Sequence, residues 1–239
     1  MIRHFSGLLL LVPILGGCQA IQTIGVVPLA GVVAEARCGP VAVDVANRRG
    51  HVEVRADPSV DQPVIVATTK GPDGRLQAAS WAAAELVRDE PYPVLRVMAE
   101  GDGRPTDIQI RVPAIVGIRV RNAGGPVIIA GAGGAVDVQN GVGLERGGDT
   151  TITLVSALEA PFMARTATGA LTVTVPRMSR GHVHATSGVG SVAVIAPRRE
   201  VISGAKATAS DWSGTLNGGT NDVRLIAEHG PVTFRITRW

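Results

Sequence analysis

The sequence has few aromatic residues, few cysteines and little net charge. Only three Phe, three Trp and one Tyr occur among its 239 residues, which disfavours a core built around large rings. Val, Ala, Leu and Ile must fill a narrow interior instead. The net charge of +3 comes from scattered residues, so a nucleic-acid-binding protein, which needs a concentrated basic surface, is disfavoured as well. The 30 Gly and 15 Pro are too few for a low-complexity chain.

Residues 1–17 have the pattern of an export signal. A basic start precedes an apolar run from Leu8 to Leu15, and small residues follow. The run is too short to cross a bilayer, which needs about 20 residues. It ends in Leu15-Gly16-Gly17-Cys18, which resembles the lipobox of bacterial lipoproteins. The resemblance implies cleavage before Cys18 and lipidation of Cys18, whose acyl chains would hold the protein on a membrane.

Residues 18–38 are predicted to be the lipidated cysteine followed by a tether. Gln19 stands where an aspartate would favour retention in the inner membrane, so we expect an outer-membrane location in the cell envelope. An ordinary secretory signal is the alternative, and a disulfide between Cys18 and Cys38 then becomes possible. If Cys18 is lipidated, Cys38 is a buried apolar thiol or pairs between chains.

From residue 39 onward, apolar and polar side chains alternate, which is typical of half-buried β-strands. Val41–Val45 and Leu171–Val175 are clear cases. The segment Leu76–Val87 is the one interruption, because its alanines permit a short helix while Trp81, Ala83 and Val87 permit a strand. We expect a helical turn that leads into a strand there. The sequence therefore predicts an all-β fold.

An internal repeat organises these strands. Five twelve-residue segments align without gaps, each with a strand, a polar turn, a glycine at the eighth position and a second strand. They begin at Val43, Ile118, Phe162, Val183 and Val223. A weaker copy begins at Val136, and its second strand is displaced to residues 151–154. The predicted turn glycines are Gly50, Gly125, Gly143, Gly169, Gly190 and Gly230.

The repeat positions suggest how the copies stack. Tight turns often need a positive φ, which glycine adopts at little steric cost. Turn-closing residues recur at the fifth position, and we expect them to form a polar ladder along one edge. These residues are Asn47, Asn122, Asn140, Thr166, Ser187 and, where the pattern lapses, Ala227. A β-solenoid and an antiparallel sandwich both fit the spacing, and the narrow core favours the solenoid.

The order of these motifs resembles the bacterial putative-adhesin family of β-strand-repeat proteins, a domain of unknown function. Members carry a T/N-x-x-G-x-[VIL]-x-[VI] repeat, a strand ending in Pro before the repeats and a glycine-rich turn before the last strand pair. Here Ile110–Pro113 precedes the repeats, and Leu216–Thr220 precedes a closing hairpin at Val223–Ile236. The resemblance spans residues 40–237 and implies a β-helix in the envelope without an established activity.

The chain is accordingly divided into four parts. After the signal (1–17) and the tether (18–38), residues 39–115 are a strand-rich capping segment and residues 116–239 are the β-repeat solenoid. We expect the closing hairpin and Trp239 to cover one end of the solenoid, and the strands of residues 39–66 to cover the other. Covered ends prevent edge-to-edge association of β-sheets.

No motif for catalysis or for a cofactor emerges. The glycine-rich Gly131–Ala135 runs into a strand rather than a helix, so it lacks the helix N-terminus of a dinucleotide site. His182 and His184 share one strand face, but no cysteine or carboxylate lies nearby in sequence to complete a metal site. The acidic residues of the repeats occupy different repeat positions, which disfavours a β-helical polysaccharide lyase. We predict a protein that is not an enzyme and needs neither metal nor cofactor.

Arginines gather in or near the predicted turns. Arg48, Arg49 and Arg121, with Arg146 and Arg165 nearby, could form a basic edge that meets anionic lipopolysaccharide or acidic glycans. Ordinary solubilising charge is the alternative. The predicted function is that of a lipid-anchored envelope protein with a binding or structural role and envelope glycans or proteins as partners. A periplasmic partner in envelope maintenance or signalling is the second hypothesis, and a glycan-active enzyme the third.

Overall fold

The computed structural model describes residues 25–31, 39–88, 91–99, 101, 103–141, 146–197 and 201–238. The predicted signal and Cys18 lie outside these residues, as do Cys38, Gly143 and Trp239. The described part of the chain is all-β, with nineteen strands, and it contains no helix long enough to span a membrane.

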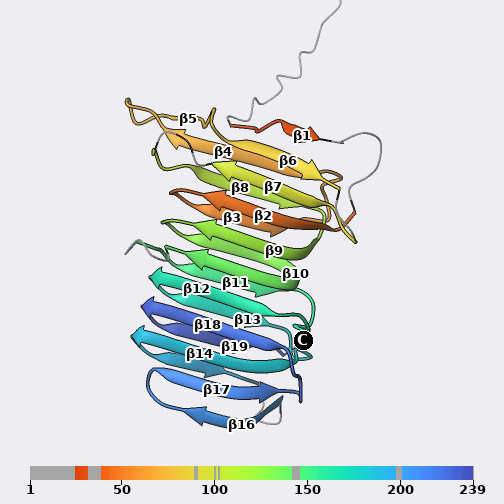
Figure 1. Cartoon of the computed structure of the whole chain (residues 1–239), viewed down its shortest axis with the longest axis vertical. Coiled ribbons are helices and arrows are strands. Elements are labelled where there is room, and N and C mark those ends of the chain that lie inside the picture. The colour runs from red at the N-terminus through yellow and green to blue at the C-terminus, as the bar shows by residue number, and fades with distance from the viewer. Residues whose placement is uncertain are drawn as a thin grey trace, which may run out of the picture.

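Seven of the described strands stack in parallel to form a first ladder (Figure 1). In order along the stack they are β7 (Val94–Ala99), β2 (Val41–Asn47), β9 (Ile115–Asn122), the second half of β10 (Val127–Asn140), β12 (Phe162–Thr168), β18 (Asp222–His229) and β14 (Gly181–Val189). Every second side chain points inward, as the sequence alternation predicts. One continuous buried column is Leu95, Val43, Ile118, Val136, Phe162, Val223 and Val183.

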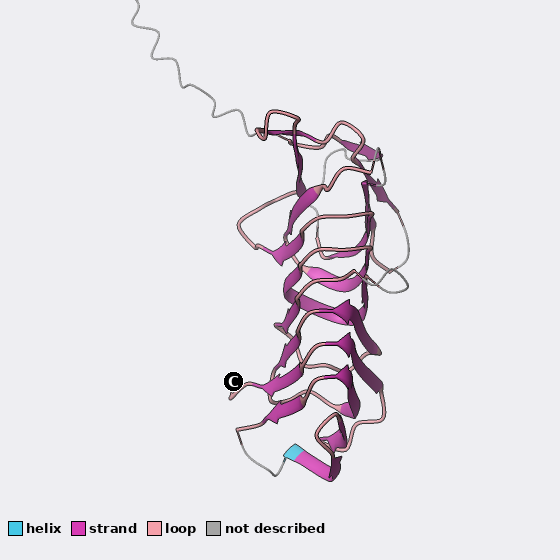
Figure 2. Ribbon diagram, turned by 90° about the vertical axis from the view of Figure 1, so that its left-hand side faces the viewer, coloured by secondary structure: helices cyan, strands magenta, loops and turns pink. Residues whose placement is uncertain are grey.

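A second parallel ladder runs along the same stack (Figure 2). It contains β8 (Asp107–Val112), β3 (Val52–Ala56), the first half of β10, β11 (Thr150–Leu154), β13 (Leu171–Val175), β19 (Val232–Ile236) and β15 (Val192–Ile195). The chain passes from a first-ladder strand through a short turn to a second-ladder strand, and we call such a pair a tier. The displaced strand predicted at residues 151–154 is confirmed as β11.

The order of the tiers departs from the sequence near both ends. The β2/β3 tier lies between the β7/β8 and β9/β10 tiers, so parallel pairing crosses the predicted boundary between residues 39–115 and 116–239. The β18/β19 tier lies between the β12/β13 and β14/β15 tiers. The predicted closing hairpin at Val223–Ile236 is therefore wrong: its two strands join different ladders inside the stack and cover neither end.

Strands that pair in the antiparallel sense cover the ends instead. At one end β6 (Ala83–Val87) pairs with β7, and β4 (Val64–Lys70) pairs with β8 and with β5 (Leu76–Ala78). Strand β1 (Leu29–Gly31) adds to β6 in parallel. At the other end β17 (Asp211–Leu216) pairs with β14, and β16 (Ile202–Ala207) extends it.

The segment Leu76–Val87 consists of β5, a turn and β6. The expected strand is therefore confirmed, and the helical turn expected before it is wrong. Trp81 lies in the turn, where its Nε1 donates a hydrogen bond to Thr106 Oγ1 at 2.9 Å. The alanines on either side therefore serve strand packing: Ala79 and Ala84 are both buried in the core. Alanine content permits a helix, but here the packing of the end strands over β7 and β8 decides the conformation.

The predicted polar ladder is confirmed for its three asparagines, which are buried, whereas Thr166 and Ser187 bond to turn carbonyls instead. Asn47 Nδ2 donates to Asn122 Oδ1 at 3.2 Å, and Asn122 Nδ2 donates to Asn140 Oδ1 at 3.2 Å. Asn140 Nδ2 continues to Thr150 Oγ1 at 3.1 Å. The same amides donate to turn carbonyls such as that of Gly125. The ladder satisfies polar backbone groups that would otherwise be buried without partners.

The turn glycines form a second column beside the polar ladder. Its members in stacking order are Gly50, Gly125, Gly148, Gly169, Gly230 and Gly190. Each lies so close to the turn that precedes it in the stack that an added Cβ would overlap the backbone of that turn. Gly148 takes this place in the weaker repeat copy, whose predicted glycine, Gly143, lies outside the described residues.

Candidate functional site

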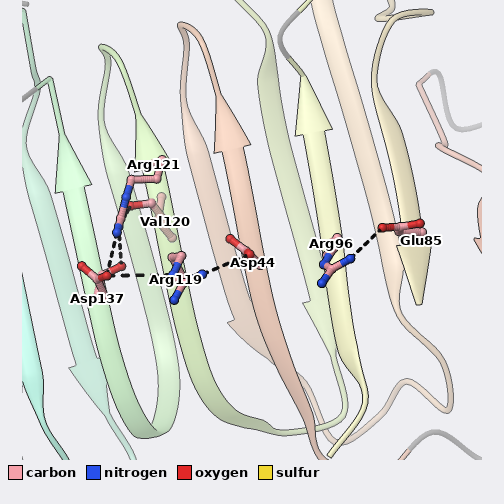
Figure 3. A network of polar contacts seen from close by, with 7 residues as sticks. All are labelled: Asp44, Glu85, Arg96, Arg119, Val120, Arg121 and Asp137. Atoms are coloured by element: carbon pink, nitrogen blue, oxygen red, sulfur yellow. Dashed lines mark hydrogen bonds and ion pairs between the residues drawn. The ribbon is translucent and has the colours of Figure 1, made fainter. Parts of the chain in front are cut away.

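A row of alternating charges crosses the outer face of the first ladder (Figure 3). Strand register aligns Glu85, Arg96, Asp44, Arg119 and Asp137 on five neighbouring strands. The guanidinium of Arg96 lies 3.4 Å from Glu85, and that of Arg119 lies 3.7 Å from Asp44 and 3.9 Å from Asp137. These outward positions follow from the alternation of each strand, but only the register brings the residues together.

A groove of about 560 Å³ runs beside this row. Small residues at matching register positions, Ala42, Gly117 and Ala135, lie along it on β2, β9 and β10. Because these side chains are short, the outer face is hollowed where they stand. The charged residues that line the groove are Asp44, Arg96, Arg119, Asp137, Asp222 and Arg224. Sequence reasoning missed this surface, since its parts are separated by up to 182 positions between Ala42 and Arg224.

Stability alone gives a weak reason for the charge row. Arg119 is 59% exposed in its side chain, and Arg96 is 48% exposed. Exposed ion pairs each contribute about 0.2–1 kcal/mol, and salt screens them. The guanidinium and carboxylate groups can therefore give up their ion pairs and bind a ligand instead, at a small loss of folding free energy. They offer hydrogen-bond donors and acceptors at each successive strand, which suits a long polar ligand.

The predicted basic edge is divided between two surfaces. Arg121 lies on β9, and its Nη2 is 2.7 Å from Asp137 Oδ2 on the outer face. Arg165 is likewise paired, with its Nε donating to Glu228 Oε1 at 2.9 Å. Arg48 and Arg49 lie apart from both, in the turn between β2 and β3, and Arg146 lies in the connection between β10 and β11. The three arginines line a pocket of about 410 Å³ together with Gly103, Ala123 and Gly124.

The two histidines singled out in the sequence lie side by side on β14 and bond to the neighbouring β17. His182 Nδ1 is 2.9 Å from Thr215 Oγ1, and His184 Nε2 is 2.9 Å from Asp211 Oδ2. Within the described ranges, no group of three or more His, Cys, Asp or Glu residues is arranged to hold a metal ion. The histidines thus tie the covering strand to the stack.

Comparison with known proteins yields a likeness of fold. No family model matches the chain, and no curated protein matches it. The crystal structure of a "putative cell adhesion protein" from Clostridium sporogenes matches with a TM-score of 0.54 and 11% identity, over 84% of this chain and 94% of that one. A "putative adhesin" from Bacteroides fragilis matches over the same shares at 13% identity and a TM-score of 0.30. The chain therefore shares its all-β fold with the Clostridium sporogenes protein.

Proposed function

We propose that this chain is a non-catalytic, adhesin-like binding protein of the cell envelope whose binding domain is a β-solenoid. The groove beside the charge row is the observation that carries the proposal. It is a shallow surface that crosses several tiers, with charged groups repeating from strand to strand about every 4.8 Å. An extended glycan fits such a surface, because its hydroxyl groups can both donate to carboxylates and accept from guanidinium groups.

Two further observations support the proposal. The chain alternates between two parallel ladders, and similar turns stack in columns, as expected when a solenoid winds tier upon tier. The carboxylates of the charge row are engaged with arginines rather than set against a nucleophile, an arrangement that suits binding better than acid–base catalysis. The shared fold with a protein described as adhesive agrees with this role.

The groove is tested by filling it. Gly117→Leu introduces a side chain on the outer face, where an added Cβ would make only ordinary contacts, 3.7 Å from Ala135 O and 3.8 Å from Ala42 Cβ. We expect the variant to keep its melting temperature and to lose retention on immobilised envelope polysaccharide by at least about tenfold, because the ligand and the leucine compete for the same space.

Ala130→Leu is the matched control, since Ala130 occupies an outward, half-buried position on the second ladder. Both variants are made in the full chain carrying Cys18→Ser, so that the protein is purified without lipid. If the Gly117→Leu and Ala130→Leu proteins are retained equally, the groove does not bind the polysaccharide and this part of the proposal is wrong.

We further propose that a lipid on Cys18 anchors the protein at the β1 end of the stack, in the outer membrane. The lipobox-like Leu15–Cys18 motif supports the anchor. Residue Val26 forms a bridge with Val66 of β4, so the described chain begins among the strands that cover that end. The β16–β17 end would then extend furthest from the membrane.

Fractionation of cells that carry Cys18→Ser tests the anchor: we expect the variant to leave the membrane fraction, while the parent chain stays in it. Protease treatment of intact and lysed cells then tests whether the strand domain lies on the cell surface. Cleavage on intact cells favours adhesion, whereas protection until lysis favours the periplasmic role in envelope maintenance or signalling. If Cys18→Ser and the parent fractionate alike, the lipid anchor is wrong.

A further inference from the structure

The arginine pocket at the turn edge is separate from the groove, and the groove does not account for it. We propose that Arg48, Arg49 and Arg146 bind a tetrahedral oxyanion, namely the phosphate group of a phosphorylated sugar or of a lipid headgroup. The inference goes beyond the proposed glycan binding, because it concerns another surface and a charged ligand.

The pocket exists because the middle of three stacked turns lacks long side chains. Gly50 N donates to Gly124 O at 2.8 Å, and Gly125 N donates to Gly147 O at 3.1 Å, so the three turns follow one another directly. Arginines extend from the two outer turns, while the middle turn offers Ala123 and Gly124. With neighbouring strands about 4.8 Å apart, the outer turns are roughly 10 Å apart. That interval is the pocket, and the three arginines line it.

The charge of the pocket is not compensated by the protein that the structure describes. None of the three guanidinium groups forms a hydrogen bond or an ion pair with a described residue, and all three side chains are exposed. Arg119, Arg121 and Arg165 differ in this respect, since each is paired with an acidic residue. Three neighbouring cations repel one another, and a bound anion relieves this repulsion.

A phosphate group fits this arrangement better than a carboxylate. Guanidinium groups donate paired N–H bonds in a planar fork, and each fork engages two oxygens. A phosphate monoester presents three terminal oxygens and carries up to two negative charges, so three arginines can approach it from different sides. A carboxylate has two oxygens and one charge, and it would leave part of the cluster unmatched.

Calorimetric titration of the full chain carrying Cys18→Ser tests the proposal at low salt. The probes are inorganic phosphate, glucosamine 1-phosphate with glucosamine as its neutral control, and phosphatidic acid vesicles with phosphatidylcholine vesicles as theirs. We expect inorganic phosphate to bind weakly, with a Kd that rises with salt. Tighter binding of the phosphorylated sugar assigns a glycan source, and tighter binding of phosphatidic acid vesicles assigns a lipid source. Absence of binding for all three phosphate probes overturns the proposal.

Variants distinguish a built site from general positive charge. Arg49→Gln and Arg146→Gln should each weaken phosphate binding about tenfold, the usual effect of losing one charge-assisted hydrogen-bond partner. Arg235→Gln is the matched control, because Arg235 is an exposed arginine on β19, away from the pocket lining. Equal weakening by Arg235→Gln would show that net charge alone attracts the anion, and would overturn the proposal.

Ala123→Glu supplies a second test that keeps the fold. It places a carboxylate in the middle turn, between the arginines, where it should abolish phosphate binding without lowering the melting temperature. Retained binding in a folded Ala123→Glu protein contradicts the site. Gly117→Leu should leave phosphate binding unchanged, so failure of the groove proposal and failure of the pocket proposal are distinguished by the same set of proteins.

Discussion

Replacing Gly125 with valine is expected to lower the free energy of unfolding by about 2–6 kcal/mol, which is a large part of the ~5–15 kcal/mol typical of a domain. The φ of Gly125 is +106°, a region where a side chain costs about 1–3 kcal/mol. An added Cβ would also lie 2.7 Å from the carbonyl carbon of Gly50. Relieving that overlap requires the two turns to separate, at about 1–3 kcal/mol. Urea denaturation followed by circular dichroism measures the loss.

Gly117→Ala is the control, because its Cβ would meet only ordinary contacts and its φ is not positive. We expect it to lose less than about 1 kcal/mol. Gly190→Val near the other end should also destabilise the protein, since its Cβ would lie 2.8 Å from both the carbonyl carbon and oxygen of Gly230. An unchanged melting temperature in either valine variant would contradict the stacking of the turns.

Replacing Asn122 with leucine is expected to lower the free energy of unfolding by about 3–5 kcal/mol, because each buried polar group left without a partner costs about 1–3 kcal/mol. Asn122 is 3% exposed. Its amide donates to Gly50 O and Gly125 O, both at 3.2 Å, and it links Asn47 to Asn140 in the polar ladder. Leucine is similar in size but offers neither donor nor acceptor.

Asn221→Ala provides a comparison outside the ladder. Asn221 is half-buried, and its Nδ2 donates one hydrogen bond, to Ala160 O at 3.0 Å. We expect a loss of about 1 kcal/mol there. Equal losses in the Asn221→Ala and Asn122→Leu proteins, measured by the same denaturation, would mean that the ladder contributes no more than the single half-buried hydrogen bond of Asn221.

Local features of the fold could be predicted from the sequence because they depend on single repeats. The alternation of apolar and polar residues in Val41–Val45 predicts a strand there, and the glycine at the eighth repeat position predicts the turn that follows it. Asn47 and Asn122 occupy the same repeat position, so their contact follows once the copies stack in parallel. The weaker copy is less predictable, because an insertion between residues 141 and 150 moves its turn to Gly148.

The order of the tiers could not be predicted, since it depends on which copies become neighbours. The Val43 and Ile118 strands pair with each other across 75 positions, and Val43 also pairs with Leu95. Many repeat strands have similar apolar faces, so the sequence shows little preference for one strand over another as a pairing partner. The groove depends on this same register.

Arg121 illustrates the difficulty at the site. Its position near the turn suggested that it belongs to the basic edge, but its place on the strand directs its side chain toward Asp137.

Because the β18/β19 tier lies inside the stack, the tiers on either side of it depend on these late strands for their pairing. Strand β15 pairs only with β19 among the described strands, and β14 pairs with β18 and β17. A chain emerging from its N-terminus can assemble the earlier tiers, but β15 has no strand to join until β19 has been made. Such pairing over long sequence distances slows folding. Deletion of residues 222–238 should therefore do more than shorten the stack, because it opens a gap between β12/β13 and β14/β15. Completion of the fold thus waits until residues 222–238 have been made, and a chain that stops short of them remains exposed to degradation.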